Sequence, residues 1–257
     1  MCLLIFAFQK HPRYPLLMAA NRDEFHARPT QPAAFWAQHP QLRAGRDLEA
    51  GGTWMGVTRG GRFAAVTNFR DPARTAPAPR SRGDLPVEYL TGDESPEVFL
   101  HRISARDNDY AGYNLLLGDC GSLWYYSNFL EEPERQPTQL QPGVYGLSNA
   151  LLDTPWPKVT RGKSILRALT GGEASHDLLA ESVASGELAQ EQDLHPHGLS
   201  GEMDRLLSAQ FIVTPRYGTR ATTTLWMDDA GCIGWRERSF DAQGQPTGDV
   251  EELLRPD

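Results

Sequence analysis

The first eight residues, Met1-Cys2-Leu3-Leu4-Ile5-Phe6-Ala7-Phe8, place a cysteine directly before an unbroken apolar run. A short apolar run of this length is typical of a buried strand. Removal of Met1 would leave Cys2 with a thiol and a free α-amino group on one residue. Because a nucleophile and a base are then supplied together, Cys2 is a candidate for covalent catalysis. The alternative is a buried cysteine that acts only as a small apolar side chain.

Charge and cysteine content narrow the classes of function. The 257-residue chain has a net charge of −8, which argues against nucleic acid as its main partner. Its three cysteines, Cys2, Cys120 and Cys232, are widely spaced and predict neither a disulfide framework nor a metal site. We therefore expect a protein of the reducing cytoplasm. No apolar run approaches the length of a transmembrane segment, and no targeting segment is visible.

A second apolar run, residues 14–20, follows a polar turn and should pair with the first run as a hairpin. It leads directly into Asn21-Arg22-Asp23-Glu24, which we expect to form an exposed turn close to Cys2. An arginine there would lower the pKa of a thiol, and an aspartate could orient an α-amino group. Glu24 is a rival for the role of Asp23, or a structural ion-pair partner.

The rest of the chain predicts antiparallel strands in pairs, with helices grouped in the middle of the sequence. Residues 25–46 are expected to be an irregular loop with room for one short strand, residues 71–86 a surface excursion, and the acidic C-terminal end a tail. The further strands are expected at residues 51–57, 62–69, 113–118, 123–127, 143–149, 210–214, 219–227 and 232–239. Helices are expected at residues 95–105, 156–169 and 176–184, the first with Ser95 as N-cap and Pro96 following, and a short helix or turn is expected at residues 201–209. This pattern indicates one α+β domain over residues 1–257.

Polar residues at later strand ends are further candidates for the site. Asn68 and Asn149 each follow a predicted strand, where asparagine commonly serves only the turn. A side-chain amide is also the donor that an oxyanion hole needs. In the segment Pro215-Arg216-Tyr217-Gly218-Thr219-Arg220, two arginines flank a turn. They are either a solubility device of an edge strand or an anion clamp that supports a thiolate.

Several motifs together resemble the NRDE family, also called the transport and Golgi organisation protein 2 family. The match begins with Met1-Cys2 and the segment Ala19-Ala20-Asn21-Arg22-Asp23-Glu24-Phe25, and continues in the family's order across nearly the whole chain. The other matching segments are Arg28-Pro29, Phe35-Trp36, Gly51-Gly52-Thr53-Trp54-Met55-Gly56, Ala65-Val66-Thr67-Asn68, Tyr113-Asn114-Leu115, residues 143–150, Thr154-Pro155-Trp156-Pro157-Lys158 and Tyr217-Gly218-Thr219-Arg220.

The resemblance implies a four-layer αββα sandwich of two antiparallel sheets, similar to N-terminal nucleophile hydrolases of the choloylglycine hydrolase and penicillin V acylase group. Carried over by position, Cys2 matches the nucleophile. Arg22 and Asp23 resemble the arginine and aspartate of the second strand, with a different spacing. Asn149 and Asn68 match the oxyanion-hole positions, and Arg220 matches the late arginine better than Arg216. The remaining positions expected to bind a ligand are Asn21, Glu24, Trp54, Arg216 and Tyr217.

Two functions follow from this resemblance. The first is a cysteine-dependent amidohydrolase that acts on an amide or thioester of a small amphipathic molecule and needs no cofactor. The second is a non-catalytic binding and trafficking protein for haem or a fatty-acyl or acyl-coenzyme A ligand on the same fold. An inactive scaffold is a third reading, and it predicts that Met1 is retained. The sequence names no substrate.

Overall fold

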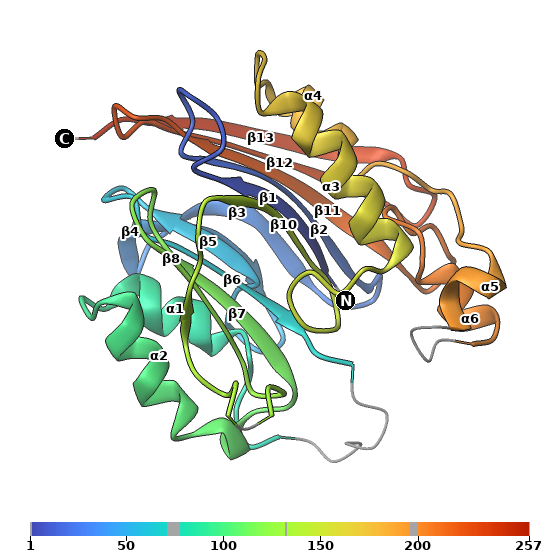
Figure 1. Cartoon of the computed structure of the whole chain (residues 1–257), viewed down its shortest axis with the longest axis horizontal. Helices are drawn as coiled ribbons and strands as arrows, with labels where there is room; N and C mark the ends of the chain where they lie inside the picture. The colour runs from blue at the N-terminus through green and yellow to red at the C-terminus, as the bar shows by residue number, and fades with distance from the viewer. Residues whose placement is uncertain (1, 71–77, 132, 196–199, 257) are drawn as a thin grey trace.

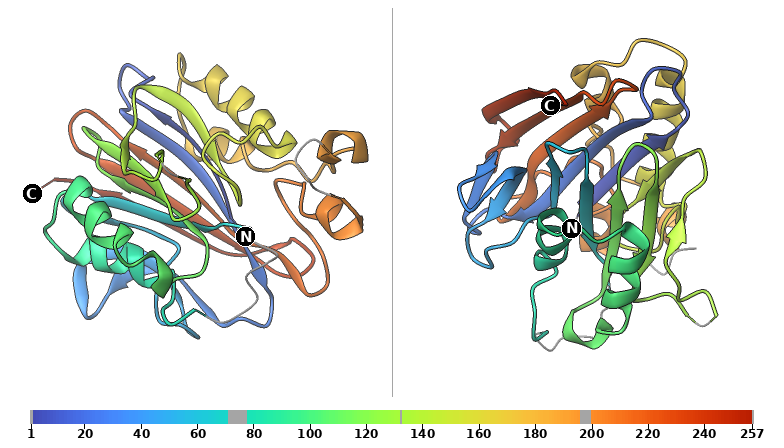
Figure 2. Two further views of the ribbon diagram at one scale, coloured as in Figure 1. Left: turned by 60° about the horizontal axis from the view of Figure 1, so that its bottom comes forward. Right: turned by 90° about the vertical axis from the view of Figure 1, so that its left-hand side faces the viewer.

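The computed structural model describes residues 2–70, 78–131, 133–195 and 200–256, with the backbone alone at residue 2. These residues form two antiparallel sheets that lie face to face (Figure 1). The expected α+β class and the pair of antiparallel sheets are confirmed. The sheets and their outer helices can be followed from two further sides in Figure 2.

The first sheet contains both strands of the N-terminal hairpin in its interior. Its spatial order is β10 (Gly143–Leu147), β1 (Cys2–Phe8), β2 (Leu16–Phe25), β11 (Tyr217–Met227), β12 (Ile233–Phe240) and β13 (Pro246–Leu254). The second sheet runs β3 (Thr30–Trp36), β4 (His39–Asp47), β5 (Met55–Thr58), β6 (Phe63–Asn68), β7 (Tyr113–Gly118), β8 (Leu123–Ser127) and β9 (Thr138–Gln139).

Helices cover the outer face of each sheet. The apolar side of α3 (Pro157–Leu169) and α4 (His176–Glu181) packs on the odd-numbered residues of β1 and β2. On the second sheet, α1 (Asp84–Thr91) and α2 (Pro96–Ser104) pack on β6 and β7. The shorter helical segments are η1 (Asp107–Asp109), α5 (Glu191–Leu194) and α6 (Glu202–Leu206). The predicted N-cap of α2 is confirmed, because the Ser95 side chain accepts a hydrogen bond from Val98 N.

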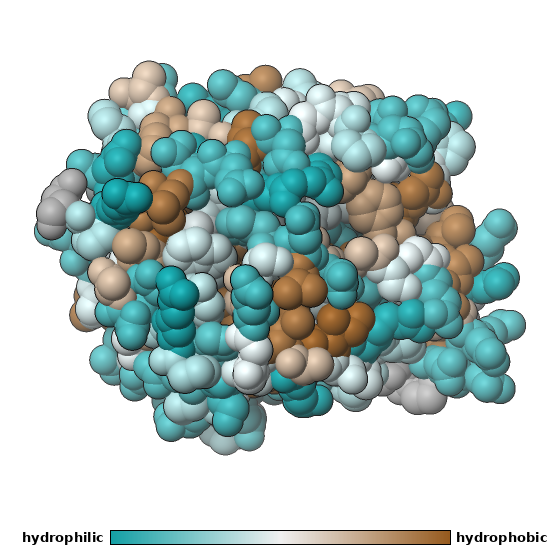
Figure 3. Space-filling view, turned by 90° about the horizontal axis from the view of Figure 1, so that it is seen from above, coloured by the Kyte–Doolittle hydropathy of each residue, from teal (hydrophilic) through white to brown (hydrophobic). Residues whose placement is uncertain are grey.

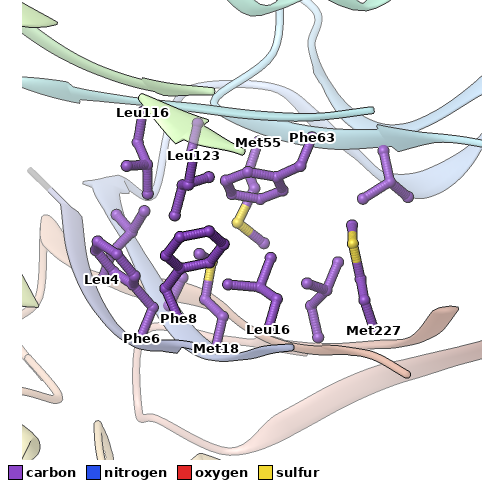
Figure 4. Close-up of a cluster of buried hydrophobic side chains, with 14 of the residues drawn as sticks. Leu4, Phe6, Phe8, Leu16, Met18, Met55, Phe63, Leu116, Leu123 and Met227 are labelled. Atoms are coloured by element: carbon purple, nitrogen blue, oxygen red, sulfur yellow. The ribbon is translucent and has the colours of Figure 1, made fainter. Parts of the chain in front are cut away.

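Within each strand, every second residue points into the core between the sheets. The even-numbered side chains of β1, which include Leu4 and Phe6, face Met55, Phe63 and Leu116 of the second sheet (Figure 4). Because side chains alternate along a strand, the odd-numbered ones lie under the helices. Both faces of the hairpin are therefore buried, which explains the continuous apolar runs in the sequence.

Several sequence expectations are wrong, each for a physical reason. Residues 25–46 form β3 and β4, with Pro32 in a bulged edge strand where proline is tolerated. The C-terminal tail forms the exposed edge strand β13, whose charges pair with those of β12, so it shows no apolar pattern. Residues 210–214 form no strand, only an isolated bridge at Val213. In the expected excursion 71–86, α1 begins at Asp84, and residues 71–77 lie outside the described residues.

The face that carries α4 and β13 is mostly hydrophilic, with separate apolar patches (Figure 3). Ion pairs account for part of this character. Arg236 of β12 pairs with Asp249 of β13 and with Asp177 of α4, both at 2.8 Å. The outer face of these strands is therefore held by charged side chains rather than by an apolar cover.

Candidate functional site

The four polar residues 21–24 lie inside β2 and not in an exposed turn, which corrects the sequence expectation. Asn21, Arg22 and Asp23 are buried, with exposed fractions of 1%, 5% and 1%. Alternation sends Arg22 toward the second sheet and Asp23 toward the helices. The strand continues past Ala20 because each of these polar side chains has protein partners.

The start of β1 lies between residues 21–24 of β2 and the end of β10, which leads to Asn149. In the β1–β2 register, the Cα of Cys2 pairs with that of Arg22. On the other side, Leu4 pairs with Leu147 at the end of β10, so the residues after Leu147 run alongside the beginning of β1. The fold therefore places the backbone of Cys2 opposite Arg22, and it places Leu4, two residues further along β1, opposite the last residue of the strand that precedes Asn149.

Arg22 occupies a shielded position between the sheets. Its guanidinium carbon lies 4.4 Å from the centre of the Trp54 ring. Its Nη1 donates to Thr30 Oγ1 at 3.2 Å, and its Nη2 lies 3.6 Å from Asp47 Oδ2. Glu24 Oε2 lies 3.8 Å from the same Nη2. Trp54 thus serves as the platform for Arg22, and Asp47 is a partner that sequence reasoning missed.

Asp23 and Glu24 point to opposite faces of β2 and have different partners. Asp23 Oδ1 accepts a hydrogen bond from Thr219 Oγ1 at 2.7 Å. Burial raises the pKa of Asp23, while the charge of Lys158, the Thr219 hydrogen bond and the charge of Arg22 act in the opposite direction. Glu24 belongs instead to the ion-pair group of Arg22, and also lies 3.9 Å from Arg28.

Asn21 is placed as a structural brace. Its Nδ2 donates to the carbonyl oxygens of Val183 and Gln210, both at 2.8 Å. Its Oδ1 accepts from Thr222 Oγ1 at 2.6 Å. The side chain therefore ties β2 to β11 and to the segment between α4 and β11, on the helix side of the first sheet.

The structure brings Asn68, the last residue of β6, together with Asn149, which follows β10 of the other sheet. Asn149 Nδ2 donates to the Asn68 carbonyl at 2.8 Å, and the Arg70 N–H donates to the Asn149 carbonyl at 2.8 Å. Asn149 is buried and carries a second N–H on the same nitrogen. The two asparagines therefore join the end of β6 to the segment after β10.

A cavity of about 340 Å³, which we call the site cavity, is lined by Asn68 but not by Asn149. Its lining includes Asp23, Asn68, Arg80 and Arg82, together with the Arg22 group. A second cavity of about 190 Å³, the side cavity, shares Arg22 and Trp54 with it and also contains Arg220 and Glu237. The Arg22–Trp54 stack therefore forms a wall common to both cavities.

In residues 215–220, some side chains hold neighbouring backbone in place and others lie on the surface. Arg220 Nη1 donates to the carbonyl oxygens of Phe25, His26 and Arg28, at 3.0, 3.1 and 3.1 Å. Burial, together with the nearby charge of Arg22, lowers the pKa of Arg220. Tyr217 OH donates to the Asp23 carbonyl at 3.1 Å. Arg216 is exposed and lines neither cavity.

Sequence reasoning also missed Lys158 and Thr219 as site residues. Lys158 stands at the start of α3 and is buried, and Thr219 lies opposite Asp23 in the β2–β11 register. Both fall within sequence segments that matched the NRDE family, so the family match could have pointed to them. Residue type and expected secondary structure at these two positions gave no such indication.

Neither a metal site nor a membrane helix is found in the described part of the chain. Within residues 2–70, 78–131, 133–195 and 200–256, no group of three histidine, cysteine or acidic side chains is arranged to hold a metal ion. Over the same ranges, every helix is too short or too polar to cross a membrane.

Comparison with known proteins gives the family. The family model described as Transport and Golgi organisation 2 matches residues 1–242. The Transport and Golgi organization protein 2 homolog of Bos taurus is 37% identical over 261 residues, which cover 93% of each chain. The Homo sapiens homolog is 36% identical with the same coverage, and the Drosophila melanogaster protein is 32% identical over 70% of this chain and 69% of its own. This chain belongs to the Transport and Golgi organisation 2 family.

Proposed function

We propose that the protein is an N-terminal cysteine hydrolase that cleaves an amide or thioester of a small amphipathic molecule. The proposal treats residues 1–257 as one domain of the N-terminal nucleophile type. Two stacked antiparallel sheets with helices on both outer faces support this assignment. The observation that carries it is the strand register, which sets the backbone of Cys2 opposite Arg22 and pairs Leu4 with Leu147, two residues before Asn149.

In this mechanism, Met1 is removed and the α-amino group of Cys2 accepts the thiol proton. The thiolate adds to the substrate carbonyl, so a C–S bond forms and the carbonyl oxygen becomes negative. The amine or thiol leaving group departs with the proton from the α-ammonium group. Water then cleaves the acyl-cysteine, with the α-amino group again accepting and returning the proton.

The surrounding side chains have separate roles in this proposal. Arg22 stabilises the thiolate, and Asp23 orients the α-amino group. Asn149 and Asn68 supply amide donors for the oxyanion, a contribution of about 3 kcal/mol per donor in well-studied cases. Arg220 and Tyr217 hold the end of β2 in place, since both donate to backbone carbonyls there.

The test uses a panel of fatty-acyl p-nitroanilides and fatty-acyl thioesters of N-acetylcysteamine. Cys2→Ala should abolish turnover, and Asn149→Ala should reduce kcat by about 10²–10³-fold. Cys120→Ala and Cys232→Ala are matched controls, because both cysteines lie in turns at the other end of the sandwich. Undiminished turnover by Cys2→Ala would exclude Cys2 as the nucleophile.

Ligand binding without catalysis is the second candidate function, and a separate cavity favours it. This far cavity, of about 970 Å³, is lined by turns at the opposite end of the sandwich. Its walls combine the apolar residues Leu42, Leu90 and Met227 with Arg59 and His39. A cavity of this size and mixed lining suits a large amphipathic anion such as haem or an acyl ligand.

Haem titration followed by visible spectroscopy tests this candidate, with haem treated as cargo. A Soret shift at micromolar haem that is lost in His39→Ala but kept in Cys2→Ala would support binding at the far cavity. A shift lost in Cys2→Ala would place the ligand at the N-terminal cysteine instead, and the absence of any shift would exclude haem binding.

A further inference from the structure

Thr219 occupies the position in β11 that lies directly opposite Asp23. The β2–β11 register pairs Thr219 with Asp23. The next pair is Ala221 with Arg22, so Arg220 is the extra residue of a β-bulge. Bulges re-aim side chains and are common beside functional sites. Thr219 thus contacts Asp23, while Arg220 donates to backbone carbonyls beyond the end of β2.

The Thr219 hydroxyl has a defined direction of hydrogen bonding. Its Oγ1 accepts from the Ile212 N–H at 2.9 Å and donates to Asp23 Oδ1 at 2.7 Å. An amide N–H can only donate, and a hydroxyl has one proton. The hydroxyl therefore accepts on the side of Ile212, and its single proton is directed at the Asp23 carboxyl.

The Ile212 N–H is itself held in place by the segment before β11. Thr219 N donates to the Ile212 carbonyl at 2.8 Å, and Val213 forms an isolated bridge with Gly218. A Cβ on Gly218 would lie 2.6 Å from the Ile212 carbonyl oxygen, so this close approach requires glycine. Ile212 and Thr219 have exposed fractions of only 3% and 1%. The chain of hydrogen bonds is therefore shielded from water.

Several groups near Asp23 influence its charge. Burial raises the pKa of Asp23, while the charge of Lys158 of α3, the Thr219 hydrogen bond and the charge of Arg22 act to lower it. Tyr217 OH donates to the Asp23 carbonyl oxygen of the backbone. The Thr219 contact is a direct hydrogen bond to the carboxyl itself. It can therefore set the orientation of that carboxyl as well as its charge.

We propose that Thr219 is a positioning residue whose hydroxyl, held by the Ile212 N–H, fixes the Asp23 carboxylate in the orientation that receives the α-amino group of Cys2. The purpose of this contact rests on the proposed function, in which Asp23 orients that amine. The hydrogen-bonded chain from Ile212 through Thr219 to Asp23 does not depend on it.

The direct test is the titration of Asp23, followed by the ¹³C shift of its carboxyl in protein labelled at aspartate. Asp23→Asn assigns the signal. Thr219→Val removes the hydroxyl and should raise the titration midpoint of Asp23 by about 1 pH unit, the usual share of one hydrogen bond to a carboxylate. Thr222→Val is the matched control, because Thr222 Oγ1 of the same strand donates to Asn21 Oδ1 of β2 at 2.6 Å. It should leave the Asp23 midpoint unchanged.

Further variants keep the proposal open to refutation. Thr219→Ser keeps the hydroxyl and should keep the wild-type midpoint. Thr219→Ala replaces Thr219→Val if the valine variant does not fold, and it carries the same expectation. An unchanged midpoint in the variants without a hydroxyl, or a raised one in Thr219→Ser, would overturn the proposal.

The pH profile of Cys2 alkylation by iodoacetamide shows whether Thr219 acts on Cys2 through Asp23. Thr219→Val should shift the midpoint of this profile in the wild-type background but not in Asp23→Asn. Equal shifts in both backgrounds, or none in either, would contradict that route.

The two measurements separate this inference from the proposed function. If Met1 is retained while Thr219→Val still raises the Asp23 midpoint, the proposed function fails and the link between Thr219 and Asp23 stands. If Met1 is removed and Cys2 is reactive but the Asp23 midpoint does not move, the positioning role of Thr219 fails alone.

Discussion

Replacing Arg22 with methionine separates structural support from chemistry at the start of β1. Methionine has a similar length and can remain against the Trp54 ring, but it removes the charge. The ion pairs of Asp47 do not disappear, because Arg28 Nε lies 2.6 Å from the same carboxylate. The perturbation therefore removes mainly the stacked cation and its hydrogen bond to Thr30.

The expected loss of stability comes from these two contacts. A desolvated cation–π contact contributes about 1–2 kcal/mol. A hydrogen bond from a charged donor contributes about 1.5–3 kcal/mol. At 3.6 and 3.8 Å, the pairs with Asp47 and Glu24 add little. Together the two contacts give an expected loss of about 2.5–5 kcal/mol in the free energy of unfolding for Arg22→Met.

The assay measures unfolding by urea and, separately, the rate of Cys2 alkylation at pH 7 by peptide mass spectrometry. Loss of a neighbouring cation should raise the thiol pKa by about one unit or more and slow alkylation about 10-fold. Arg62→Met is the matched control, since Arg62 also stacks on a ring, that of Tyr89 at 4.0 Å, at the other end of the sandwich. It should cost similar stability without slowing Cys2. If Arg22→Met destabilises the fold but leaves the alkylation rate unchanged, Arg22 does not support a thiolate.

Two further predictions concern the packing around the site. Burial of Asp204 acts to raise its pKa, but the hydrogen bond from Arg70 outweighs this effect and the pKa is lowered in the folded protein. The Arg70–Asp204 pair therefore stabilises the fold at any pH above the pKa of Asp204 in the unfolded chain. This stabilisation is lost as the pH falls through the lower pKa of the folded protein. Asp204→Asn should therefore lower the free energy of unfolding in urea by about 1–3 kcal/mol at pH 7. The difference from wild type should shrink below pH ~4. A difference that stays constant with pH would show that the stabilisation does not come from the ionised carboxylate. Gly162→Ala would place a Cβ 2.6 Å from Ile5 Cγ1 and should destabilise by about 1–3 kcal/mol. Gly171→Ala meets no atom within 4 Å and should change stability by less than about 0.5 kcal/mol, and equal effects of the two substitutions would contradict close packing of α3 on β1.

The sequence predicted the buried centre of the fold well, because apolar periodicity reports burial directly. The hairpin of β1 and β2 and the helices α2 and α3 follow from apolar runs and capping residues. Edge strands lack this signal. In β3, the bulge removes the regular partner of the Ala33 N–H, and Glu237 Oε1 of the other sheet accepts it at 2.8 Å instead. A local sequence pattern does not predict such a long-range contact.

The candidate site shows the same division. Cys2, Arg22 and Asp23 were predicted as site residues because they stand at the ends of apolar runs. The sequence also suggested a turn for the polar residues 21–24, and that part was wrong. Their burial depends on partners far along the chain, such as Trp54 for Arg22 and Thr219 for Asp23. Lys158 was missed because a lone lysine in the first turn of a helix normally faces solvent.

The central claim is that Cys2 carries a free α-amino group beside a reactive thiol. The most direct measurement is the intact mass of the purified protein before and after reaction with 2-cyanobenzothiazole, which condenses with an N-terminal cysteine, in folded and urea-unfolded samples. We predict a mass lower than the sequence by one methionine residue, with one adduct formed in both samples and none in Cys2→Ala. Full retention of Met1, with no adduct in the unfolded sample, would contradict the account.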